Sequence, residues 1–81
     1  MSNEKELTFG EKAVGLNFNP SNDPKVQEVK EYFARVIDVI HNLPVDPTPT
    51  FPSLRNIIIT GAIIQCIRAQ MEVVKALTWK D

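Results

Sequence analysis

Four prolines, at positions 44, 47, 49 and 52, crowd one short stretch near the middle of the chain. A proline lacks the backbone N–H and its ring clashes with the preceding turn, so no helix can cross this stretch. We expect residues 44–52 to form a semi-rigid connector rich in polyproline conformation. Because the connector is short, the flanking segments most simply form an antiparallel hairpin.

The segment before the connector has the pattern of an amphipathic helix. Asp23 offers an N-cap side chain, and Pro24 suits the first helical position. We predict a helix over residues 24–42. Its apolar residues alternate at spacings of three and four, which is typical of a helix that packs along a partner. These residues are Val26, Val29, Phe33, Val36, Ile40 and Leu43.

The segment after the connector predicts a longer helix, over residues 53–78. Most of its circumference is apolar, roughly twice the arc that one neighbouring helix can cover. A monomer rarely leaves so much apolar surface in water, so we predict a homo-oligomer. Polar and charged residues interrupt the apolar sequence of this helix, so it would cross a membrane poorly. We expect no membrane association. One polar stripe contains Gly61, Gln65, Arg68, Glu72 and Lys75.

A short helix is expected near the N-terminus. Thr8 and Glu11 fit a capping box, and Gly15 can end the helix in a left-handed conformation. We expect residues 16–20 to be extended, because Pro20 disfavours a helical conformation in the residue before it. Residues 1–7 are expected to be a flexible polar N-terminus.

Together these segments predict an all-α protein with one helical hairpin domain over residues 1–81: a short N-terminal helix, then an antiparallel helical hairpin. A chain of 81 residues has a marginal core. Cys66 is the single cysteine, so no internal disulfide can form, and the single histidine, His41, has no cysteine at a metal-ligand spacing. We therefore expect no metal and no cofactor. We expect a homo-oligomer to stabilise the small core. The single Cys66 is expected to be buried, in a protein of the reducing cytoplasm.

The titratable residues do not have the pattern of a catalytic site, and we predict that the protein is not an enzyme. His41 and Cys66 lie far apart in the sequence. Glu28 and Glu31 resemble half of the magnesium motif of helical nucleotide pyrophosphatases, but the last helix offers only Glu72 as a further carboxylate. The net charge of −1 argues against duplex nucleic acid as a partner and leaves a small anionic ligand open.

Among the cations of the predicted helices, three stand apart from the others. Lys12, Lys30 and Arg55 have no acid three or four residues away, whereas Lys25 has Glu28. Each of the three lies near an aromatic residue or a helix start. Cations, aromatic faces and an exposed amide are the groups that hold a nucleotide, through phosphate charge, base stacking and hydrogen bonding. The simpler interpretation is that these cations are solvated surface residues.

Residues 9–21 (FGEKAVGLNFNPS) resemble the signature of a helical hairpin domain shared by two groups of phage immune-evasion proteins, anti-CBASS protein two and Thoeris anti-defence protein one. The resemblance covers nearly the whole chain except the proline connector. The chain lacks the β-sheet region that Thoeris-type members add, so it is more similar to the anti-CBASS type. The resemblance continues at residues 29–30, 33–34, 36–38, 69–71, 74–76 and 78–79.

The resemblance implies an oligomer, often a hexamer, in the cytoplasm of the host bacterium. Members of the family bind cyclic di- and trinucleotides, and some bind cyclic ADP-ribose isomers, without cleaving them. This sequestration blocks CBASS or Thoeris antiviral signalling. The alternative is a helical protein-interaction or structural module with no nucleotide ligand.

The family motif also implies individual site residues. Phe9 and Asn19 match ligand contacts, Phe18 a stacking face and Lys30 a phosphate contact, while Arg55 matches loosely as a cation near the start of the final helix. Lys12 joins them because, like Lys30 and Arg55, it lies in a predicted helix without an acid three or four residues away. The alternative role for Phe9 and Phe18 is core packing. The predicted ligand-binding residues are thus Phe9, Lys12, Phe18, Asn19, Lys30 and Arg55.

Overall fold

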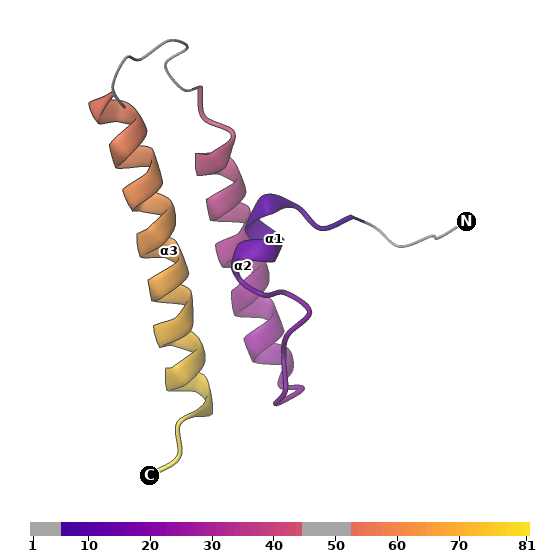
Figure 1. Cartoon of the computed structure of the whole chain (residues 1–81). Helices are drawn as coiled ribbons and strands as arrows, with labels where there is room; N and C mark the ends of the chain where they lie inside the picture. The colour runs from indigo at the N-terminus through magenta and orange to yellow at the C-terminus, as the bar shows by residue number, and fades with distance from the viewer. Residues whose placement is uncertain (1–5, 45–52) are drawn as a thin grey trace.

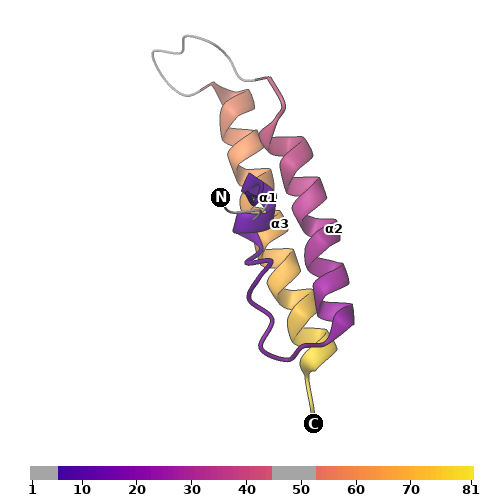
Figure 2. The ribbon, with the colours of Figure 1, turned by 90° about the vertical axis from the view of Figure 1, so that its right-hand side faces the viewer.

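The computed structural model describes residues 6–44 and 53–81, and within these ranges the chain is helical with no strand. It contains α1 (Phe9–Ala13), α2 (Pro24–His41) and α3 (Leu54–Thr78). α2 and α3 pack side by side and run in opposite directions, and α1 packs on α2 (Figures 1 and 2). The predicted all-α class is confirmed. The predictions for residues 1–5 and 45–52 lie outside the described residues.

Local capping explains why α1 exists despite its five residues. The Thr8 hydroxyl accepts from the Glu11 N–H at 3.1 Å, and the Glu11 carboxylate accepts from the Thr8 N–H at 2.8 Å, so the predicted capping box is confirmed. At the other end, the N–H groups of Gly15 and Leu16 donate back to the carbonyls of Lys12 and Glu11. Gly15 has φ +63°, which completes the C-terminal motif that glycine favours.

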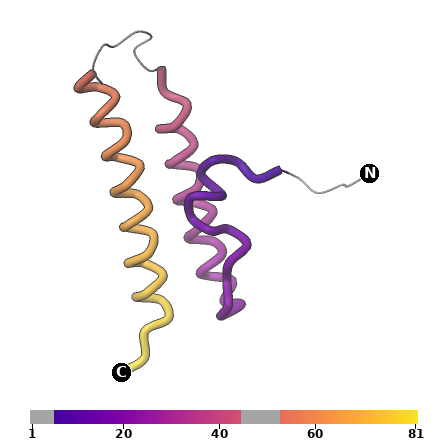
Figure 3. The backbone as a smooth tube through the Cα atoms, in the orientation of Figure 1, coloured from indigo at the N-terminus to yellow at the C-terminus, as the bar shows by residue number. Residues whose placement is uncertain are grey.

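The segment after α1 differs from the prediction. Residues 16–20 contain turns and are not simply extended. The Phe18 N–H donates to the Gly15 carbonyl at 2.8 Å, and the Asn22 N–H donates to the Asn19 carbonyl at 3.1 Å. A proline restricts only the residue directly before it, so the rule could not constrain the earlier positions. The backbone trace shows this segment running back along α2 to the start of that helix (Figure 3).

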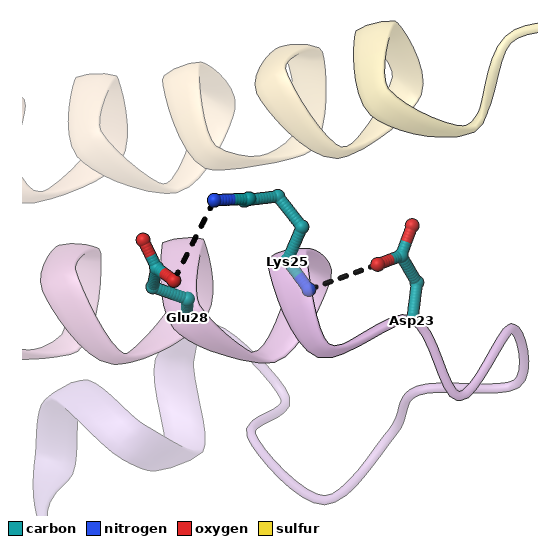
Figure 4. A network of polar contacts seen from close by, with 3 residues as sticks. All are labelled: Asp23, Lys25 and Glu28. Carbon is teal, nitrogen blue, oxygen red and sulfur yellow. Dashed lines mark hydrogen bonds and ion pairs between the residues drawn. The ribbon is translucent and has the colours of Figure 1, made fainter.

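The start of α2 is as predicted. The Asp23 carboxylate accepts from the Lys25 N–H at 2.9 Å, as an N-cap should (Figure 4). Lys25 also forms the predicted ion pair with Glu28, with 3.8 Å between Nζ and Oε2. α2 ends at His41, one residue before the predicted end.

The start of α3 differs from the prediction by one residue. α3 begins at Leu54 and not at Ser53, because Ser53 is the N-cap: its hydroxyl accepts from the Asn56 N–H at 3.0 Å. Its last residue, Thr78, is the predicted one. Capping rules act over three or four residues, which is why the start of α3 could be placed so closely.

The buried face of α2 matches the predicted one only in part, since Val26 is buried as predicted but the C-terminal half differs. Ala34 and Ile37 form the core cluster with Val14, whereas Val36, predicted to face the core, is exposed. The prediction assumed one partner helix, but α2 packs against both α1 and α3, so its buried stripe lies between them. Cys66, predicted to be buried, is only half-buried against this cluster, because α2 covers one side of α3.

α1 is held on α2 by a carboxylate and a close backbone approach. Asp38 accepts two hydrogen bonds of 2.7 Å, from the Gly10 N–H and from the Thr8 hydroxyl. Gly10 is buried, and a Cβ there would overlap the Ala34 carbonyl oxygen. Only glycine therefore lets the two backbones approach this closely.

We expect Gly10→Ala to displace α1 and to lower the free energy of unfolding by about 1–3 kcal/mol, the usual cost of overpacking. The matched control is Gly61→Ala, since a Cβ at Gly61 meets nothing within 4 Å. In the single chain, replacing this mid-helix glycine should stabilise α3 by about 0.5–1 kcal/mol. Thermal melts followed by circular dichroism measure both changes. Equal melting temperatures for the Gly10→Ala variant and the parent would show that α1 is not docked as described.

α3 leaves most of its apolar surface uncovered. Gln70 is its one buried residue, which confirms the prediction that α2 cannot cover the apolar circumference. By length and composition α3 also qualifies as a candidate membrane span, with 25 residues and a mean hydropathy of 1.5 over an 18-residue window. That window is 6% buried. Its exposed large apolar residues are Leu54, Ile57, Ile58, Ile64, Met71, Val73 and Leu77.

Candidate ligand-binding groove

A groove of about 640 Å³ is bounded by α1, the turn that follows it, Lys30 of α2 and the C-terminal half of α3. We call it the loop–α3 groove. This volume is within the usual range for small-molecule sites. Three of the six predicted site residues line it, Lys12, Phe18 and Lys30, and Lys75 of α3 lines it as well. None of the acidic residues in the described part of the chain lines it, so these lysines give the groove a positive charge that suits an anion.

Lys30 is the most buried of these lysines, at 5% exposure. Its ammonium donates to the Gly15 carbonyl at 3.0 Å and to the Phe18 carbonyl, and lies 5.6 Å from the centroid of the Phe18 ring. Burial lowers the pKa of Lys30. An ammonium has three donors, so one N–H is left for a ligand. Lys30 thus fastens the turn after α1 and still brings a cation to the groove.

Phe18 does not pack in the core of the chain. Its side chain is 71% exposed and lines the loop–α3 groove on one side and a smaller hollow of about 250 Å³ on the other. The core-packing alternative for Phe18 is therefore wrong within the single chain. An exposed ring beside Lys30 offers a face on which a base can stack.

Asn19 lines the smaller hollow next to Phe18. Its side-chain N–H donates to the Asp23 carbonyl at 3.1 Å, and its side-chain oxygen accepts from the Ser21 hydroxyl at 2.8 Å. Asn19 therefore closes the turn that leads into α2, and it places Phe18 by fixing the backbone beside it.

Phe9 and Arg55 lie outside the loop–α3 groove. The Phe9 ring stacks on His41 with 3.9 Å between centroids and 5° between planes. The Arg55 Nε donates to the Pro44 carbonyl at 3.0 Å. Both contacts are at or just beyond the C-terminal end of α2, so a single chain does not bring the six predicted residues to one place.

Gln70 and Lys75 line the groove but were not among the predicted site residues. The Lys75 Nζ lies 5.4 Å from the centroid of the Trp79 ring. Gln70 is 5% exposed. A sequence signal for Gln70 does exist: at helical spacing it falls on the stripe of Ile67 and Val74, away from the polar stripe of α3.

No group of three His, Cys, Asp or Glu side chains within residues 6–44 and 53–81 is placed to hold a metal ion. No family model matches the chain, and neither the curated proteins nor the solved structures provide a match. The family resemblance of residues 9–21 therefore stays a prediction, and the candidate site rests on the geometry of the groove.

Proposed function

We propose that this protein binds an anionic cyclic nucleotide in the loop–α3 groove and holds it without cleaving it. The observation that supports this proposal is that Lys12, Lys30 and Lys75 line the same groove as the exposed ring of Phe18, and that none of the described acidic residues lines it. Ammonium groups bind phosphate oxygens, and an aromatic face stacks on a base. A cyclic nucleotide presents both groups within a small volume.

The proposed biological role follows the family that residues 9–21 resemble. The ligand is a cyclic di- or trinucleotide or a cyclic ADP-ribose isomer, and its sequestration in the host bacterial cytoplasm blocks CBASS or Thoeris signalling during phage infection. The proposed partners are this ligand and further copies of the chain, not duplex nucleic acid and not a membrane. α2 and α3 act as an antiparallel hairpin whose copies assemble through α3, as a hexamer by the same resemblance.

Ligand recovery tests this function directly. The protein is mixed with cyclic di-AMP or a cyclic ADP-ribose isomer, binding is measured by calorimetry, and the complex is then heat-denatured. Chromatography of the released ligand should return it unchanged. A changed ligand would make the protein an enzyme, and no binding of any cyclic nucleotide would reject the proposal.

Phe18→Ala is expected to weaken the binding of cyclic di-AMP about tenfold or more, because stacking on an aromatic side chain is worth about 1–3 kcal/mol per base. The melting temperature should not fall, since Phe18 is exposed. Tyr32→Ala is the matched control: Tyr32 is an exposed aromatic residue of α2 that does not line the groove. Calorimetry compares the three proteins. Equal affinities would remove Phe18 from the site.

The second candidate function is a helical protein-interaction or structural module with no nucleotide ligand. The observation that favours it is the exposed apolar surface of α3. A module of this kind would self-associate or bind another protein. Calorimetry would detect no heat of binding when a cyclic nucleotide is added. The calorimetric experiment therefore separates the two candidates.

A further inference from the structure

Gln70 is a buried amide without a hydrogen-bond partner among the described residues. Its side chain is 5% exposed, and no described residue bonds to it. No unpartnered side-chain polar atom of the described residues is completely sealed from solvent, so the Gln70 amide atoms are still accessible. Since Gln70 lines the loop–α3 groove, a ligand in the groove can contact it.

Gln70 is the polar member of an otherwise apolar stripe of α3. It occupies a helical stripe with Ile63, Ile67 and Val74, where an apolar side chain would pack without any loss of hydrogen bonding. An amide that is largely buried, with no protein partner among the described residues, takes its hydrogen bonds from water or from a ligand. A ligand in the groove that offers both a donor and an acceptor would satisfy it.

The other polar groups of the groove cannot replace this amide. The ammonium groups of Lys12, Lys30 and Lys75 only donate hydrogen bonds. The Thr78 hydroxyl already donates to the Val74 carbonyl at 2.9 Å. Gln70 alone among the lining side chains combines a carbonyl acceptor with N–H donors, as a nucleobase edge requires.

We propose that Gln70 reads the edge of an adenine base in the nucleotide held by the loop–α3 groove, an inference that rests on the proposed function. A glutamine amide pairs with adenine through two hydrogen bonds: its carbonyl accepts from the 6-amino group and its N–H donates to N7. Guanine presents two acceptors on that edge, O6 and N7, so the Gln70 carbonyl would lack a donor there. The groove therefore favours adenine-containing cyclic nucleotides.

The test compares cyclic di-AMP with cyclic di-GMP by calorimetry on the full chain. The parent should bind cyclic di-AMP more tightly. Gln70→Met keeps the size of the side chain and removes the amide, so it should weaken cyclic di-AMP binding about 10- to 100-fold, the worth of one bidentate base contact, and leave cyclic di-GMP binding nearly unchanged. Gln70→Glu keeps a hydrogen-bond acceptor but loses the N–H donor. It should also reduce the preference for cyclic di-AMP over cyclic di-GMP. Circular dichroism checks that each variant folds.

Three outcomes would overturn the inference while the proposed function stands. The parent could bind cyclic di-GMP as tightly as cyclic di-AMP. Gln70→Met could weaken both ligands equally, which would mean that Gln70 only shapes the groove. Both folded variants could keep the preference of the parent. If the parent binds no cyclic nucleotide at all, the proposed function fails and the role of Gln70 fails with it. Should Gln70→Met not fold, the same criteria apply to Gln70→Glu.

Discussion

Substitution of Lys30 by methionine is expected to weaken cyclic dinucleotide binding about 100-fold, the largest effect of any single change in the loop–α3 groove. A charge-assisted hydrogen bond is worth about 1.5–3 kcal/mol, and each 1.4 kcal/mol is a factor of ten in affinity. The change also removes the donors that fasten the carbonyls of Gly15 and Phe18, so the stacking ring loses its fixed position. Calorimetry with cyclic di-AMP measures the loss.

The same substitution should lower the stability of the unbound protein, because two carbonyls lose a common partner. For a domain of this size, a loss of about 1 kcal/mol lowers the melting temperature by roughly 4–8 °C. Lys25→Met is the control, since Lys25 forms an exposed ion pair with Glu28, and such pairs are worth about 0–1 kcal/mol. Unchanged affinity in a folded Lys30→Met variant would show that Lys30 supports the turn and does not bind the ligand.

The helix boundaries were predictable because the interactions that set them are local. The capping box of Thr8, the N-cap of Asp23 and the left-handed Gly15 each involve residues within five positions of one another. Such short-range chemistry can be read from sequence order alone. The described structure agrees with the predicted ends of α2 and α3 to within one residue.

The docking of α1 could not be predicted in the same way. It depends on Gly10 meeting Ala34 and on Asp38 accepting from Gly10, and these partners are more than twenty positions apart. Periodicity shows that α2 is amphipathic but does not show that two helices share its apolar face. For this reason Val36 was placed in the core, although it is exposed.

The site was predictable only where the chain folds back on itself locally. Lys12 and Phe18 flank the turn after α1, and Lys30 reaches that turn from α2. Phe9 is predicted as a site residue from the family resemblance, and Arg55 mainly from its charge. Neither criterion shows where the side chain lies in the folded chain. Gln70 could not be recognised as a site residue from its sequence position, because a lone polar residue in an apolar helix does not reveal whether tertiary packing buries it.

The parent protein is expected to scatter light as an assembly several-fold larger than the 9.1 kDa chain, in buffer without detergent. The physical reason is the exposed apolar surface of α3, which other copies can cover. On this surface Ile57, Gly61 and Ile64 line a shallow apolar hollow on α3. The family resemblance of residues 9–21 predicts six copies, a mass six times that of the chain.

Ile64→Asp is expected to dissociate this assembly to monomers or small oligomers. Ile64 is exposed in the single chain, so an aspartate there does not disturb the core of Val14, Ala34 and Ile37. In an assembly the same carboxylate would be buried without a partner, at a cost of several kcal/mol. Gln65→Asp, at the neighbouring exposed position on the polar stripe, is the matched control and should keep the parent mass. A parent that stays monomeric at high concentration, or an Ile64→Asp variant with the parent mass, would contradict assembly through this face of α3.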